Sequence, residues 1–265
     1  MRTEVSIGVP GALGPDAVRV LAPRVEAAGF AGLWLNDSPQ GDSLVGLAAA
    51  AEATAHLRVA TGVIPVDRRP GAALLKDLRA SGVPESRLTL GIGSGALRRG
   101  AVDAVMEAIG VLRSGTSAAV VVGALGPRMR LLAGERADGA LLSWLPPTVA
   151  AQQAAQLREA GAAAQGEAPR AALYVRAIVD EAARPVLERE AAQYASYPAY
   201  AANFARLGVE AIDTTLPQRG EDLAAGVNAY RGGVDELVLR AITPTGSLDD
   251  ILAFVDRAAE QVFTD

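Results

Sequence analysis

A glycine-rich turn offers the clearest candidate for chemistry in this sequence. It consists of Gly123, Ala124, Leu125, Gly126, Pro127 and Arg128, between a β-branched run and a helical period. Proline is favoured in the first turn of a helix, where backbone N–H groups point outward at the positive end of the helix dipole. Such a turn can cradle a phosphate, and Arg128 or Arg130 could add charge. The same residues also suit an ordinary strand-to-helix turn.

Further candidates follow other predicted strands. Gly93-Ser94-Gly95 provides backbone that can approach a planar ring closely, or a simple loop. Asn36, Asp37 and Ser38 are candidate catalytic side chains, although Asp37 suits a helix cap equally well. Arg176 is a charge within an apolar run, so it either faces a ligand or pairs with a carboxylate. Trp144 is a candidate for stacking on a ligand, although tryptophan more often packs in a core.

Several reaction classes lack the residues that they need. Ser38 and Ser143 have no neighbouring histidine, so a hydrolytic triad has no base. The only histidine, His56, precedes a predicted strand and is expected at the surface. Without cysteine there is no thiolate nucleophile and no cysteine-ligated metal. Paired carboxylates of the glycosidase type are not apparent at the strand ends, and we expect no metal site.

The elements that must position these residues alternate along the whole chain. Eight β-rich runs predict the strands Val5–Val9, Gly32–Asn36, Arg58–Gly62, Arg87–Ile92, Ala119–Gly123, Gly139–Ser143, Ala171–Val179 and Glu236–Ile242. Helical periods predict the helices Asp16–Ala28, Ser43–Ala55, Ala72–Ala80, Ala101–Arg113, Pro127–Gly134, Pro147–Ala160, Glu181–Leu207 with a break near Pro198, Glu221–Tyr230, and a last one after Ser247.

Eight strand–helix units in about 250 residues predict an α/β protein with a closed (β/α)8 TIM barrel, in one domain over residues 1–265. The alternative, a doubly wound sheet, would carry Gly-x-Gly-x-x-Gly after its first strand. Gly8, Gly11 and Gly14 lack that spacing. Because barrel active sites form at the carboxyl ends of the strands, all the candidate turns above should meet at one mouth.

The composition limits the partners and the location. A formal net charge of -5 argues against nucleic acid, which would need a basic stripe. No apolar run reaches the roughly 18 residues of a membrane span. The first residues lack the pattern of a signal peptide, so we expect a cytoplasmic protein. Abundant alanine, glycine and arginine are typical of a GC-rich bacterial genome.

Six segments, in a common order along the chain, carry a family likeness. They are Val25–Trp34, Leu57–Val63, Arg87–Gly93, Val122–Met129, Ala133–Gly139 and Pro244–Ser247. Together they resemble the luciferase-like monooxygenase superfamily over nearly the whole chain. The closer likeness is to its deazaflavin-dependent branch, typified by methylenetetrahydromethanopterin reductase.

This resemblance implies an oxidoreductase that transfers a hydride between a coenzyme and a small organic substrate. The coenzyme would be the deazaflavin coenzyme F-420, with FMN as the second choice. The resemblance implies a cis peptide bond between Gly62 and Val63 behind the coenzyme ring, and a phosphate at Gly123 to Arg128. The expected coenzyme-binding residues are therefore Thr61, Gly62, Val63, Gly93, Gly123, Ala124, Leu125, Gly126, Pro127, Arg128 and Trp144. The family often forms homodimers, which we also expect here.

Two departures from the family pattern bear on activity. Many members carry a histidine directly after the aspartate at the second strand, where this chain has Ser38. The insertion that follows the fourth strand and covers the substrate is also shortened. An alternative function is therefore a degenerate member that binds a coenzyme or metabolite without catalysis. A third is a sugar-phosphate enzyme on the same fold, since fold does not determine function.

Overall fold

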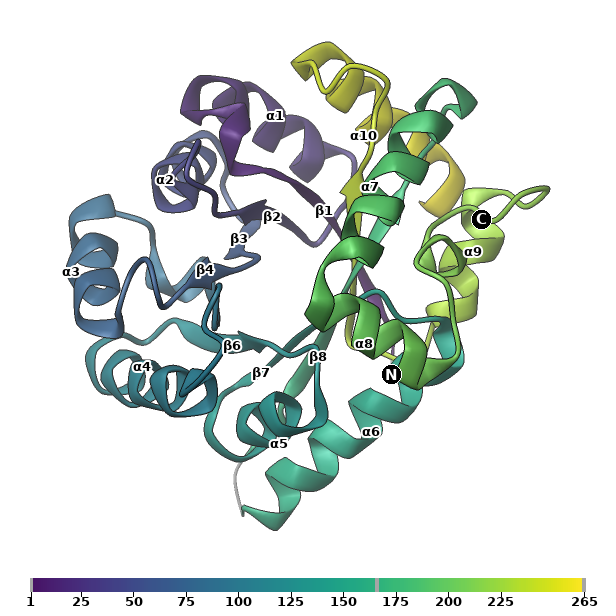
Figure 1. Ribbon diagram of the computed structural model, residues 1–265. Coiled ribbons are helices and arrows are strands. Elements are labelled where there is room, and N and C mark those ends of the chain that lie inside the picture. The colour runs from purple at the N-terminus through teal and green to yellow at the C-terminus, as the bar shows by residue number, and fades with distance from the viewer. Residues whose placement is uncertain (1, 165–166, 264–265) are drawn as a thin grey trace.

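The chain forms a closed parallel barrel surrounded by helices. The computed structural model describes residues 2–164 and 167–263, and Figure 1 shows the strands at the centre within a ring of helices. All strand pairings are parallel. The strands are β1 (Glu4–Pro10), β2 (Gly32–Asn36), β3 (Arg58–Thr61), β4 (Ile64–Pro65), β5 (Leu88–Gly93), β6 (Ala119–Gly123), β7 (Gly139–Ser143), β8 (Arg170–Ala177) and β9 (Glu236–Ala241).

The order of the strands shows how the barrel closes. Neighbours run β3-β2-β1-β9-β8-β7-β6-β5-β4, and β3 also pairs with β5. Val59 of β3 lies opposite Leu88, whereas Ile64 of β4 lies opposite Ile92 farther along the same strand. β3 and β4 therefore share one position in the barrel, which has eight positions in all. The predicted (β/α)8 TIM barrel is confirmed.

Helices follow the strands in chain order, and most of them cover the outside of the barrel. They are α1 (Pro15–Ala27), α2 (Ser43–Ala53), α3 (Gly71–Ser81), α4 (Ala101–Gly115), α5 (Pro127–Arg136), α6 (Pro147–Ala163), α7 (Arg184–Ser196), α8 (Pro198–Leu207), α9 (Leu223–Tyr230) and α10 (Leu248–Phe263). The connection from β5 to β6 holds α4 alone among helices, as the shortened insertion predicts.

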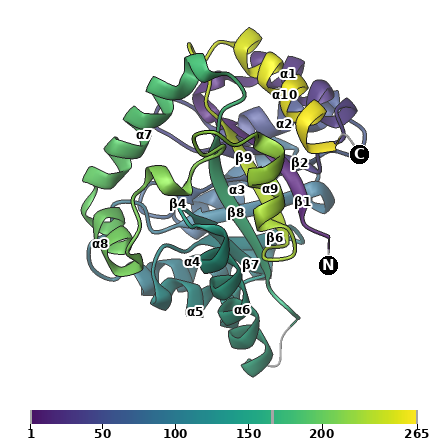
Figure 2. The same cartoon turned by 90° about the vertical axis from the view of Figure 1, so that its right-hand side faces the viewer.

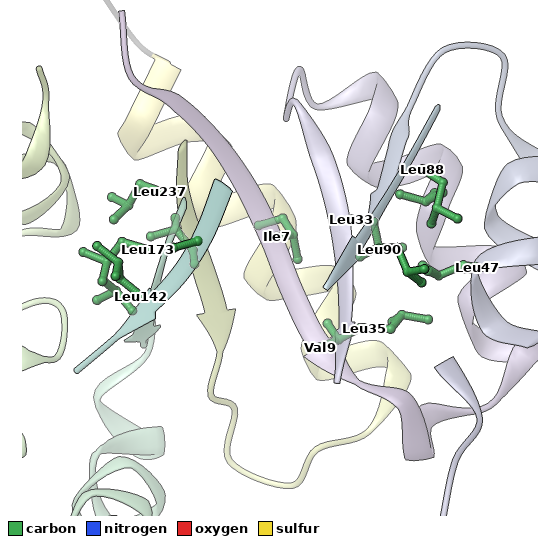
Figure 3. Close-up of a cluster of buried hydrophobic side chains, with 14 of the residues drawn as sticks. Ile7, Val9, Leu33, Leu35, Leu47, Leu88, Leu90, Leu142, Leu173 and Leu237 are labelled. Carbon is green, nitrogen blue, oxygen red and sulfur yellow. The ribbon is translucent and has the colours of Figure 1, made fainter. Parts of the chain in front are cut away.

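The two faces of each strand pack into separate apolar cores. Side chains such as Ile7, Leu90 and Leu173 point outward and pack against the helices, as Figure 3 shows. A smaller inner core holds Trp34 and Tyr174 with neighbouring apolar residues inside the barrel. Strands of a parallel sheet that are buried on both faces show continuous apolar runs rather than alternation, which explains the sequence pattern.

The third predicted strand needs a correction. It was expected to run from Arg58 to Gly62, but β3 ends at Thr61 and the chain resumes as β4 at Ile64. Between them lies the peptide bond from Gly62 to Val63, which is cis, as the family resemblance implied. The ladder is interrupted at Gly62 and Val63, and both β3 and β4 run parallel to β5.

The long connection from β8 to β9 adds a cover to the mouth of the barrel. The predicted break near Pro198 is confirmed, because Tyr197 is extended and separates α7 from α8. A residue before proline is biased toward this extended conformation. In Figure 1 the two helices lie in front of part of the barrel opening, and Figure 2 shows them on the side opposite the N-terminus.

Candidate functional site

A cavity of about 290 Å³ lies at the carboxyl ends of the strands. The ends of β2 and β5 to β8 contribute to its wall, and so do Val63 and Pro65. Tyr194 of α7 and Tyr200 of α8 line it from the long connection. The strand ends predicted to converge therefore do so, and the two tyrosines add a part of the wall that the sequence did not predict.

A larger cavity, of about 540 Å³, lies at the amino ends of the strands. Its buried acid, Glu236, accepts hydrogen bonds from the Ser6 hydroxyl at 2.6 Å and the Trp34 indole at 2.8 Å. At its rim Arg170 pairs with Glu4 at 2.6 Å. We place the functional site at the mouth instead, because barrels of this kind carry their chemistry at the carboxyl end.

Val63, which follows the cis bond, occupies a space that glycines keep open. A Cβ added to Gly93 would lie 2.7 Å from a methyl group of Val63, and one added to Gly123 would lie 3.2 Å from the other methyl group. Thr61 is fully buried, and its hydroxyl both donates to the Gly91 carbonyl and accepts from the Gly91 N–H, at 2.8 Å each. Thr61 thus ties β3 to β5, and Val63 reaches the cavity wall.

A hydrogen-bonded pair holds the backbone at the cis bond. The Tyr174 hydroxyl donates to Asn36 Oδ1 at 3.1 Å, and the Asn36 amide donates to the carbonyl oxygen of Gly62. Burial raises the pKa of Tyr174 well above its ordinary value, so the phenol stays protonated. A Cβ on Gly8 would lie 2.4 Å from this hydroxyl, which explains the glycine at that position.

The other two predicted catalytic residues lie away from the cavity wall. Asp37 accepts from the Ser43 N–H at 3.1 Å and pairs with Arg68 at 2.8 Å, which ties down the start of α2. Ser38 forms a bridge with Gly41 in the loop after β2. Of the predicted trio, the structure brings only Asn36 into the cavity.

Arg176 lies on the cavity wall and also pairs with a carboxylate. Its Nε donates to Glu190 at 3.0 Å, and its Nη1 donates to the Ser143 hydroxyl at 2.7 Å. The guanidinium carbon lies 4.0 Å from the centroid of the Trp144 ring and 4.6 Å from that of Tyr194. Trp144 is only 1% exposed and does not line the cavity, so it packs against Arg176 and would not contact a ligand directly.

The glycine-rich turn ends in an open helix terminus. α5 begins at Pro127 without a side-chain cap and without an acid in its first turn, whereas Asp42 caps α2. The N–H groups of Arg128 and Met129 have no acceptor in the described part of the chain. Free N–H groups at this position favour an anion.

The two arginines near this terminus are placed differently. Arg128 is exposed, whereas Arg130 is buried and donates to Gln153 at 3.0 Å and Gln156 at 2.9 Å. Burial lowers the pKa of Arg130, and the nearby positive charge of Arg206 adds to the effect. Of these two arginines, Arg128 is therefore the one available to an anion at the start of α5. Gly123, Ala124 and Leu125 line the cavity itself.

A family model described as luciferase-like monooxygenase matches residues 3–99 and 106–265. The chain belongs to the luciferase-like monooxygenase family. No match to this luciferase-like chain was found among curated proteins. Within residues 2–164 and 167–263 no helix is long and apolar enough to cross a membrane. The same residues hold no group of three or more histidine, aspartate or glutamate side chains placed to bind a metal ion.

Solved structures share the fold of this luciferase-like protein at low sequence identity. A coenzyme F-420-dependent secondary alcohol dehydrogenase in complex with a coenzyme–acetone adduct is 14% identical, with a TM-score of 0.76 over 97% of this chain and 99% of its own. The coenzyme F-420-dependent tetrahydromethanopterin reductase from Methanopyrus kandleri is 16% identical, with a TM-score of 0.72 over 98% and 99%. The oxygenating constituent of 3,6-diketocamphane monooxygenase from Pseudomonas putida, in complex with FMN, is 15% identical, with a TM-score of 0.72 over 97% of each chain.

Proposed function

We propose that this protein is an oxidoreductase that transfers a hydride between a deazaflavin coenzyme, or FMN as the second choice, and a small organic substrate. One observation carries the proposal. Val63 lines the same cavity as the turn from Gly123 to Leu125, and this turn leads to the uncapped N-terminus of α5. A ring with a phosphate tail needs these two features next to each other. Solved structures that share the fold are named for coenzyme F-420 or FMN.

The residues present fit such a coenzyme. Gly62, Val63 and Gly93 would lie against the ring, with Thr61 behind them. The phosphate would lie at the turn from Gly123 to Arg128, where a Cβ on Gly126 would meet no atom within 4 Å. When bound, the coenzyme supplies the hydride chemistry, and the protein supplies position and surroundings.

The chain's own side chains would order the site and exclude water. Asn36 fixes the carbonyl of Gly62 and is itself fixed by Tyr174. Tyr194 and Tyr200 stand edge to face, with ring centroids 4.9 Å apart, and close one side of the mouth. Water exclusion strengthens electrostatic interactions with a reacting group. Trp144 would contribute indirectly, by supporting Arg176.

A second candidate function is coenzyme or metabolite binding without turnover. It is favoured by the position of Ser38, which bridges to Gly41 in the loop after β2 and does not line the cavity. The single histidine, His56, lies at the amino end, next to the start of β3 at Arg58. A side chain of that type is therefore not available as a proton donor at the mouth.

Visible spectroscopy separates these functions. The purified protein would be titrated with coenzyme F-420 and with FMN, and each complex would then be reduced and mixed with an organic acceptor. A perturbed spectrum and hydride exchange with an organic acceptor are expected. If neither coenzyme perturbs the spectrum, the oxidoreductase proposal fails, and so does coenzyme binding without turnover. Binding without any exchange would replace the oxidoreductase with the second candidate.

A further inference from the structure

Arg176 presents one unused nitrogen to the mouth cavity. The residue is 5% exposed, and its Nε and Nη1 donate to Glu190 and Ser143. Nη2 has no acceptor within the described ranges. Fully buried side-chain atoms without a partner in these ranges are confined to Trp144 and Asn203, so Nη2 is not fully buried. The atom therefore reaches open space, and the open space beside Arg176 is the cavity.

The surroundings hold the guanidinium in a single orientation. Trp144 and Tyr194 stack on it, and a cation–π contact is stronger with desolvated rings than with exposed ones. Trp144 has a φ of +57°, a left-handed conformation that residues other than glycine seldom adopt. Such conformations are concentrated at functional sites, where the surroundings enforce them. Here the conformation places the indole beneath Arg176.

The charges around this nitrogen favour an anion. Arg240 of β9 lies opposite Arg176 in register, so both side chains start from the inner face of the barrel. Arg240 donates to the carbonyl of Ala241 and makes no ion pair in the part of the chain that the structure describes. Glu190 pairs with Arg176, and the charged side chains that act on Tyr174, on the cavity wall, are Arg240, Arg176 and Glu190, which are two positive charges and one negative charge. One further negative charge would balance them.

We propose that Arg176 and Ser143 bind a carboxylate group of the substrate, which would make the substrate a small organic acid. This inference rests on the proposed function, because it assigns the substrate end of the same cavity. Nη2 offers a planar, charged donor, and Ser143 accepts from Nη1 while its own hydroxyl hydrogen has no acceptor in the described ranges. The rings of Tyr194 and Tyr200 add flat apolar surface for the rest of a small acid.

The proposal separates two anion sites at one mouth. The coenzyme phosphate would lie at α5, after β6, and the carboxylate would lie on β8, two barrel positions away. The two oxygens of a carboxylate can accept from Arg176 Nη2 and from the Ser143 hydroxyl, whereas the N–H groups at a helix terminus suit a phosphate.

Benzoate and benzamide provide a matched pair of probes, since they differ mainly in charge. Calorimetric titration of the full chain is expected to show benzoate binding about tenfold more tightly than benzamide, as a charge-assisted hydrogen bond would give. Arg176→Met should bring this ratio to about one, and Arg176→Lys should keep part of it because the charge remains although the Nη2 donor is lost. Arg189→Met removes an exposed arginine of α7 that does not line the cavity, and it should leave the ratio unchanged.

Each outcome decides the proposal. An equal affinity for both probes in the native protein overturns it, and so does an unchanged ratio in folded Arg176→Met. Where Arg176→Met does not fold, the ratio in Arg176→Lys decides in the same way. If Arg176→Met weakens the binding of FMN but not of riboflavin, the guanidinium holds the coenzyme phosphate and the proposal is wrong. If the benzoate preference depends on Arg176 while no coenzyme binds, the carboxylate site stands and the oxidoreductase function fails.

Discussion

Tyr174 and Asn36 form a hydrogen-bonded pair that crosses the barrel and ends on the cis bond. The tyrosine lies on β8 and the asparagine at the end of β2, and the phenol donates to the amide oxygen at 3.1 Å. Because Asn36 Oδ1 accepts this hydrogen bond, the Asn36 N–H₂ group points at the Gly62 carbonyl. A residue far along the chain thereby positions the backbone on which the coenzyme ring would rest.

Removing the phenol oxygen tests this positioning. Tyr174→Phe leaves Asn36 Oδ1 without its donor, and we expect the free energy of unfolding to fall by about 1 kcal/mol. Coenzyme affinity should fall as well, because the Gly62 carbonyl loses its fixed partner. Denaturant unfolding and coenzyme titration measure the two effects. Tyr197→Phe is the matched control, since Tyr197 is 42% exposed and accepts only from Gln193. Equal behaviour of the two variants would contradict the positioning role.

The barrel could be predicted from the sequence because its signal is periodic. Apolar runs of strand length alternate with helical periods, and parallel pairing then brings the strand ends to one edge. This is why Asn36, Gly93 and Gly123 were expected together, and they do line one cavity. The end of the third strand was wrong because side-chain periodicity contains no information on the isomer of the Gly62–Val63 bond.

The rest of the site depends on loop geometry and on distant contacts. Asp37 and Ser38 follow Asn36 directly, yet the loop turns them toward Arg68 and Gly41. Tyr174 was missed although a signal existed, since it precedes Arg176 by two residues and so shares its face of the strand. No local pattern marks Tyr194 or Tyr200, because only the folded connection after β8 brings their helices over the mouth.

Gly93 and Val63 are predicted to be coupled. Gly93→Ala would place a Cβ 2.7 Å from a Val63 methyl group, and overpacking of this kind costs about 1–3 kcal/mol of unfolding free energy. Val63→Ala removes that methyl group, so the double variant should be more stable than the sum of the single changes predicts. A double-mutant cycle from denaturant unfolding measures the coupling. If the two changes in unfolding free energy are strictly additive, contact with Val63 is not the reason for a glycine at position 93.

The acid stability of the protein should depend on Glu26. Its carboxylate accepts from the backbone N–H groups of His56, Ala55 and Leu57, which hold its pKa below the ordinary value of 4.5. A lowered pKa in the folded state stabilises the protein above about pH 4.5, and this contribution disappears as the pH falls through the folded value.

Glu26→Gln should therefore lower the melting temperature at pH 7, and the difference from the native protein should shrink below about pH 4. Thermal unfolding followed across this pH range measures the effect. Glu107→Gln changes an exposed acid on α4 and serves as the control. A difference that stays constant down to pH 3 would rule out the carboxylate as its origin.

Gly126→Leu tests the phosphate cradle with little risk to the fold. A Cβ at Gly126 meets no atom within 4 Å, and its φ of -109° is open to any residue. The leucine side chain would instead fill the space above the free N–H groups of Arg128 and Met129. Loss of hydrogen bonds to a charged group, at about 1.5–3 kcal/mol, should weaken coenzyme binding at least tenfold in a spectroscopic titration. Gly110→Leu is the matched control, because a Cβ at this exposed position of α4 also meets no atom. If Gly126→Leu binds the coenzyme with native affinity, the coenzyme phosphate does not bind at the start of α5.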